Sequence, residues 1–143
     1  MGLDMFIVGT DRPAPSKDSL WEAASAASGR ETEEGTSWYW RKASTIHCAL
    51  LAAEQLDPDT DADWIEISAR ALRALRSDLW SVLSDPEELG PELLPIYDGF
   101  LGGCTDYGRD YVALMRETFR HVTEALMLLD KRPGTRFYYM ASW

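Results

Sequence analysis

The densest mixture of chemically capable side chains lies in the segment 38–47, which reads WYWRKASTIH. Its histidine, His47, could act as a general acid, a general base or a metal ligand near neutral pH. His47 follows Ala43 by four residues and precedes Leu51 by four, so it falls on the apolar face of a helix that we expect over 37–56. Two interpretations stay open: a catalytic group, or a buried imidazole satisfied by one polar partner. The apolar surroundings favour the buried imidazole.

Two adjacent cations, Arg41 and Lys42, follow Trp40 in the same segment. The expected helix places them in its first turn, where free N–H groups and the positive end of the helix dipole can hold an anion such as phosphate. The alternative is that the pair lies on the solvent-exposed side of an amphipathic helix. The sequence favours this alternative, and it keeps the anion site as a candidate.

A second candidate is the segment 98–107, DGFLGGCTDY, which combines three glycines with Thr105, Asp106 and Tyr107. A glycine-rich loop before a helix resembles a phosphate cradle in outline, because glycine lets backbone amides approach a ligand closely. Neither GxxxxGK[ST] nor GxGxxG is present, however. We therefore favour a packed turn that is capped by Thr105 or Asp106.

The sequence gives little support for a catalytic cysteine or a metal site. Cys104 beside Asp106 could be a nucleophile only with a base nearby, and the histidines of the chain are His47 and His121. His121 has no second ligand at helical spacing, and Cys48 and Cys104 are not spaced as a ligand pair. We expect two reduced thiols, no metal and no cofactor.

Asp4 is a third candidate, because it lies inside the apolar N-terminal run GLDMFIVG. A carboxylate in an apolar strand must find donors or be neutralised. We expect a structural ion pair with Arg41 or Lys42, or a hydrogen bond from a terminal hydroxyl.

These groups must be positioned by a small number of elements. Periodicity, capping residues and proline breaks predict strands at the two ends of the chain and three main helices between them. The expected strands cover 2–9 and 137–143, with a β-like tetrapeptide at 64–67; the expected helices cover 37–56, 68–84 and 106–130, with an isolated turn at 85–90. Ser68 is the expected N-cap of the second helix. Residues 11–36 are expected to be a mostly exposed connection with a short helix near 17–27.

The resulting fold class is α+β and predominantly helical. We expect three helices packed on a small sheet in which the N- and C-terminal strands are neighbours, all within a single domain, 1–143. The chain carries 24 acidic and 14 basic residues, a net charge of −10, which disfavours binding to nucleic acid or to an anionic membrane. No apolar run approaches the ~20 residues that span a bilayer. We therefore expect a cytoplasmic location. The acidic surplus could also suit a partner with a basic surface, and a DNA-mimicking inhibitor would be the extreme case of such a protein.

Four segments together resemble one family. They are MGLDM at the N-terminus, YWRKA with IH at 39–47, LLP, GF and TDY between 93 and 107, and FYY with SW at 137–143. The chain is similar to small proteins of tailed bacteriophages and prophages that begin MGLDMY, carry YWRKAN-x-IH and GFFFG-x-TDYDEYY, and close on FYY-x-SSW. It departs from that pattern at Ser44, Cys48, Ala49, Gly108, Arg109 and 140–141.

The resemblance implies a phage or prophage origin and action inside a bacterial cell, but it brings no reaction, substrate or catalytic residue. Its motifs cover the ligand-binding candidates, which are Asp4, Trp40, Arg41, Lys42, His47, Thr105, Asp106, Tyr107 and Trp143. The loss of the usual residues at Ser44 and Gly108 weakens any site that would use them.

Three functions are consistent with these patterns. The favoured one is a non-catalytic accessory protein that binds a host or phage protein, or a small anionic ligand, with a host-modulating or counter-defence role in view. The second is an enzyme or binding protein for a phosphorylated or nucleotide-like molecule, with Arg41 and Lys42 on the anion and His47 or Asp106 as acid or base. The third is a structural homo-oligomer that associates through its aromatic C-terminus.

Overall fold

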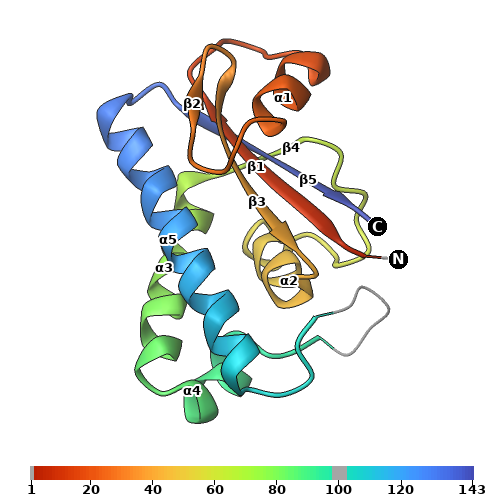
Figure 1. Ribbon diagram of the computed structural model, residues 1–143, viewed down its shortest axis with the longest axis vertical. Coiled ribbons are helices and arrows are strands. Elements are labelled where there is room, and N and C mark those ends of the chain that lie inside the picture. Colours follow the sequence, from red (N-terminus) through yellow and green to blue (C-terminus); the bar gives the residue numbers. More distant parts are fainter. Residues whose placement is uncertain (1, 98–102) are drawn as a thin grey trace.

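A single antiparallel sheet with helices on both faces forms the α+β fold of this chain (Figure 1). The computed structural model describes residues 2–97 and 103–143. The sheet has the order β2-β3-β1-β5-β4, with bounds β1 Asp4–Thr10, β2 Glu31–Thr32, β3 Gly35–Arg41, β4 Ile65–Ile67 and β5 Arg136–Ser142. The helices are α1 Lys17–Ala24, α2 Ser44–Ala53, α3 Ala69–Ser84, α4 Pro86–Leu93 and α5 Arg109–Lys131. None of these helices is both long and apolar enough to span a bilayer.

The central strand is β1, which pairs antiparallel with β3 on one side and with β5 on the other. In this register Asp4 lies opposite both Arg41 and Ser142. The expected pairing of the two ends of the chain is therefore confirmed. Successive β1 side chains point to opposite faces, as a pleated strand requires, so Met5 belongs to one apolar cluster and Val8 to the other.

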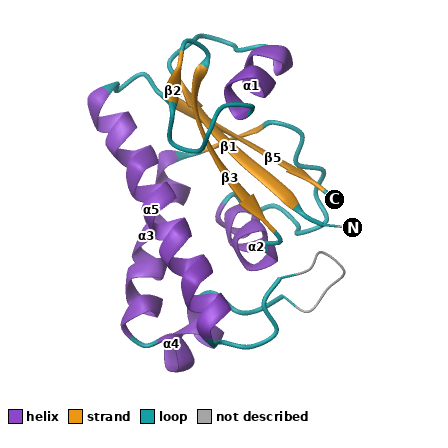
Figure 2. Cartoon of the chain, viewed as in Figure 1, coloured by secondary structure: helices purple, strands orange, loops and turns teal. Residues whose placement is uncertain are grey.

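Each face of the sheet has its own apolar layer. The larger layer lies under α2, α3 and α5 and includes Trp38, Trp40 and Tyr139 from the strands. On the other face the short helix α1 covers Val8 and Trp64 (Figure 2). The longest helices, α3 and α5, run side by side, and they contribute their buried stripes to the larger layer.

The junction between α2 and α3 is fixed by hydrogen bonds. Ser68 caps α3 by accepting from the backbone N–H of Ala71 at 3.1 Å, as the sequence predicts. A carboxylate oxygen of Glu54, just after α2, accepts from both the backbone N–H and the hydroxyl of Ser68, at 2.9 and 2.8 Å. The end of one helix therefore holds the start of the next.

The prediction of one helix over 37–56 was wrong in its first half. Residues Gly35–Arg41 form β3, and the helix α2 covers only Ser44–Ala53. The side chains of Trp38 and Trp40 are buried while Tyr39 between them is 38% exposed, which is the two-residue period of a strand. Aromatic residues favour this pleated, half-buried setting over a helix.

Two shorter segments also differ from expectation. The segment 11–36 contains the short helix expected near 17–27, as α1, but it is more than an exposed connection, because α1 buries Leu20 and Ala23 against the sheet and β2 pairs with β3. The turn expected at 85–90 continues as α4 to Leu93, with Pro91 inside the helix. Part of the expected loop at 93–105 lies outside the described residues.

Gly35 provides a test of the β2–β3 turn. Its φ of +140° is one that side chains rarely adopt, and an added Cβ would lie 2.6 Å from the carbonyl oxygen of Gly9. We predict that Gly35→Ala lowers the free energy of unfolding by about 1–3 kcal/mol, measured by urea titration with tryptophan fluorescence.

The matched control is Gly134→Ala, because a Cβ there would meet nothing within 4 Å. It should leave stability unchanged or raise it by up to about 1 kcal/mol. Equal changes in the free energy of unfolding for the two substitutions would contradict the positive φ of Gly35 and its close approach to Gly9.

Candidate functional site

The sheet topology brings four of the predicted site residues to one end of the molecule. β1 begins beside the residues where β3 and β5 end. Asp4, Arg41 and Trp143 therefore lie at the same end of the strands, and Lys42 follows in the turn to α2. The two termini lie next to each other there, beside α2 (Figure 2). We call Asp4, Arg41, Lys42 and Trp143 the sheet-end cluster.

Asp4 in this cluster is satisfied by a neighbouring strand. The Tyr39 hydroxyl donates a hydrogen bond of 2.5 Å to the Asp4 carboxylate across the β1–β3 pair. This bond raises the pKa of the tyrosine. The partner of Asp4 is thus a hydroxyl rather than Arg41 or Lys42.

The sequence predicts Arg41 and Lys42 in the first turn of a helix, and this prediction is wrong. Arg41 is the last residue of β3, and Lys42 has a φ of +55° in the turn that follows. Both side chains are exposed. The helix-terminus argument for an anion site at this pair therefore does not apply, and only the two charges themselves remain.

His47 is fully buried, and both of its ring nitrogens have partners. Nε2 lies 3.1 Å from the carbonyl oxygen of Pro58, and Nδ1 lies 2.6 Å from the Tyr139 hydroxyl. Because a carbonyl only accepts, Nε2 carries the proton and Nδ1 accepts from Tyr139 in the neutral imidazole. Burial lowers the pKa of His47, which keeps it neutral. The residue ties α2 to β5 and to the loop at Pro58, as the buried-imidazole interpretation requires.

Trp40 is also an internal residue. Its indole N–H donates to the Thr118 hydroxyl of α5 at 2.9 Å, and its ring meets His121 edge-on with centroids 4.8 Å apart. The Nδ1 atom of His121 is buried and has no hydrogen-bond partner within residues 2–97 and 103–143. Burial, helped by the nearby Arg120, lowers the pKa of His121 to about 4.

In the segment after residue 102 some side chains are exposed to solvent and others pack against the protein. Thr105 and Asp106 are exposed, and the Asp106 carboxylate accepts from the backbone N–H of Gly108 at 2.9 Å just before α5. Tyr107 accepts a hydrogen bond from the backbone N–H of Ile96 at 3.1 Å. Tyr107 is therefore a structural tie, while Thr105 and Asp106 are open to solvent.

This segment comes close to the sheet-end cluster at its first described residue. A Cβ added to Gly103 would lie 3.2 Å from the Lys42 carbonyl oxygen and 2.5 Å from the Ser44 hydroxyl. Residue 103 thus packs against the turn before α2. Residues 98–102 of the predicted glycine-rich segment lie outside the described part of the chain.

Thiol and metal chemistry are not supported by the surroundings of the cysteines. Burial, with a contribution from Asp59, raises the pKa of Cys48 to about 11. Burial and the carboxylates of Asp110 and Asp106 also raise the pKa of Cys104. Both thiols stay protonated at neutral pH and are poor nucleophiles. In the described ranges, no three histidine, cysteine or acidic side chains gather as a metal site would require.

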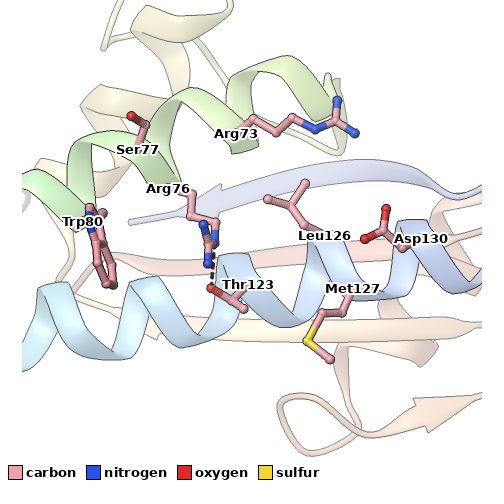
Figure 3. Close-up of a pocket in the computed structure, with 8 residues that line it drawn as sticks. All are labelled: Arg73, Arg76, Ser77, Trp80, Thr123, Leu126, Met127 and Asp130. Carbon is pink, nitrogen blue, oxygen red and sulfur yellow. Dashed lines mark hydrogen bonds between the residues drawn. The ribbon is translucent and has the colours of Figure 1, made fainter.

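A different site lies on the outer side of the helix pair, where α3 and α5 form an open groove of about 710 Å³ (Figure 3). We call it the α3–α5 groove. Its lining residues are Arg73, Arg76, Ser77 and Trp80 from α3, and Thr123, Leu126, Met127 and Asp130 from α5. Arg76 contacts Thr123 while the later Trp80 packs near the earlier Phe119, so the two helices are antiparallel along the groove.

Large apolar side chains are exposed on both walls of this groove. Trp80 on α3 is 68% exposed and Met127 on α5 is 63% exposed, more than any other large apolar residue described. The Trp80 ring packs against Phe119 with centroids 5.7 Å apart. Exposed apolar groups gathered in a hollow are typical of surfaces that bind another molecule.

Arg76 is held in a fixed position in the groove. Its Nε donates to the Thr123 hydroxyl at 3.0 Å, and its guanidinium carbon lies 4.8 Å above the ring of Phe119. Neither Arg76 nor Arg73 forms an ion pair with any residue in the described ranges. Figure 3 shows Arg76 reaching across to α5, whereas Arg73 extends along α3.

Sequence reasoning missed this groove. Arg70, Arg73 and Arg76 recur at a spacing of three along α3, and two of the three line the groove. The available signal was a tryptophan on the arginine side of an amphipathic helix: Trp80 falls outside the stripe that contains Leu75 and Leu79.

Comparisons of the chain with protein-family models, with curated proteins and with solved structures gave no match.

The buried His121 predicts a specific loss of stability in acid. Its pKa is about 4 in the folded protein and 6.5 in the unfolded chain, so the unfolded chain binds the proton first as pH falls. The free energy of unfolding should fall between pH 6.5 and pH 4, by about 3 kcal/mol from this group. Urea titrations at pH 7, 5.5 and 4 measure the loss.

The comparison variant is His121→Phe, which keeps an aromatic ring beside Trp40 and removes the titrating group. The carboxylates contribute to both proteins, so the variant should lose less stability over the same pH range. Identical pH dependence in the two proteins would contradict a neutral, buried His121.

Proposed function

We propose that this chain is an accessory protein of phage or prophage origin that acts in the bacterial cytoplasm, without catalysis, by binding another protein through the α3–α5 groove. The origin and the cellular setting follow from the sequence resemblance. The binding mode is supported by one observation above all. Trp80 and Met127 are the most exposed large apolar side chains described, and they lie on the two walls of one groove beside two arginines without ion-pair partners in the described ranges.

A binding role without catalysis is supported by the state of the candidate acid–base groups. His47 has both ring nitrogens engaged, and Asp106 accepts from a backbone N–H beside α5. The two cysteine thiols have raised pKa values. A general acid or base must reach its substrate with a free proton or lone pair, which His47 does not offer in this arrangement.

A protein partner fits the groove better than a small anion does. The groove is open, and Trp80 and Met127, exposed on its two walls, offer a large apolar contact area. Tryptophan, methionine and arginine are enriched where proteins bind one another, since they combine large contact area with polar or polarisable groups. A small anion would gain nothing from the apolar walls.

The groove predicts the outcome of affinity capture from phage-infected bacterial cells. A partner retained by the wild-type chain should be lost, or reduced at least tenfold, with Trp80→Ala, because exposed interface tryptophans carry a large share of binding energy. Quantitative mass spectrometry of the captured proteins measures the change.

The matched control is Trp21→Ala, which removes a 41% exposed tryptophan from α1 on the other face of the sheet. It should retain the partner. Thermal shift with phosphate and nucleotides covers the alternative function: a large upward shift that disappears in the Arg41→Ala/Lys42→Ala double variant would contradict the proposal.

A further inference from the structure

The charge of the α3–α5 groove is opposite to that of the chain. The chain carries a net charge of −10, whereas the groove lining has two arginines and one aspartate, a local excess of one positive charge. The net charge of the chain repels an acidic partner, whereas the two arginines of the groove attract one. Complementary charges of this kind select and orient a partner more than they add affinity.

The fixed guanidinium of Arg76 is suited to a carboxylate. Its Nε is engaged by Thr123 and its face rests on Phe119, so the side chain loses little freedom when a ligand binds. The two terminal nitrogens form no hydrogen bond or ion pair with any of the described residues. A planar guanidinium offers parallel N–H groups that a carboxylate can accept.

The shape of the groove favours a helical segment. Its walls are two antiparallel helices and present no open strand edge, so an extended segment finds no backbone partners there. Along α3 the lining runs from Arg73 to Trp80, which is about 10 Å or two helical turns. A third helix that contacts the groove through positions i, i+3 or i+4, and i+7 covers the same two turns.

Building on the proposed function, we infer that the partner segment is an acidic amphipathic helix. Its apolar stripe packs between Trp80 and Met127, and carboxylates beside the stripe pair with Arg76 and Arg73. A second copy of this chain is a poorer occupant, because a symmetric contact centred on Arg76 would bring two guanidinium groups together.

The experiment is a selection on the full-length protein from a displayed library of sixteen-residue helical peptides, with every non-stripe position varied among acidic, basic and neutral residues. Clones are counter-selected against Trp80→Ala, which defines those that use the groove. We expect the groove-dependent clones to carry Asp or Glu beside an apolar stripe. Groove-dependent clones that are neutral or basic overturn the inference and leave the proposed function standing. A selection with no Trp80-dependent clone overturns both.

Charge reversal tests the role of the arginines. Arg73→Glu, an exposed position without a hydrogen bond in the described ranges, and Arg76→Gln should each weaken a selected acidic peptide at least fivefold in fluorescence anisotropy. The double variant Arg41→Glu/Lys42→Glu adds negative charge at the sheet-end cluster and should change affinity less than twofold. Because the double variant makes the largest change in net charge, weakening by it that equals or exceeds the weakening by Arg73→Glu would mean that net charge alone acts, and it would overturn the inference.

Sedimentation of the free protein tests the competing occupant. The wild-type chain should remain monomeric up to about 100 μM, as a groove free for a partner requires. A dimer that is lost in Trp80→Ala would place a second copy in the groove and overturn the inference.

Discussion

The pairing of β1 with both β3 and β5 is the constraint on which the rest of the structure depends. It places residues far apart in the sequence side by side, and it sends alternate β1 side chains into two separate apolar layers. The larger layer is closed by helices, and α3 and α5 contribute their buried stripes to it. Once those stripes face the sheet, the opposite sides of the two helices are left to line the α3–α5 groove.

The sequence predicts the strands at both ends, Ser68 as the cap of α3, and the positions of α3 and α5, because each has a strong local signal. It does not predict that 35–41 is a strand. In that segment Trp38 and Trp40 suit either a helix or a sheet, and the choice is made by β1, whose paired residues lie 27 to 37 positions earlier in the sequence. Local spacing carries no information about such a distant neighbour. For the same reason Arg41 and Lys42 are placed wrongly on a helix.

The candidate residues show how burial determines what a polar side chain can do. Trp40, His47 and Tyr107 combine aromatic and polar character, and their polar atoms form hydrogen bonds that tie elements of the fold together. Trp80 and Met127, taken singly in their helical segments, carry no signal of a binding site. They gain meaning only when α3 and α5 pack together, which no spacing within one helix reveals.

β1 and β5 are neighbours in the sheet but lie far apart in the sequence, and this separation affects folding during synthesis. β1 is synthesised before both of its neighbours and can pair with β3 early, but its second neighbour begins only at Arg136. Until then the apolar edge of β1 and one flank of Val8 stay uncovered in the nascent chain. Contacts this distant in sequence form slowly, so the sheet closes only after β5 has been synthesised, and the open edge of β1 is prone to aggregation until then.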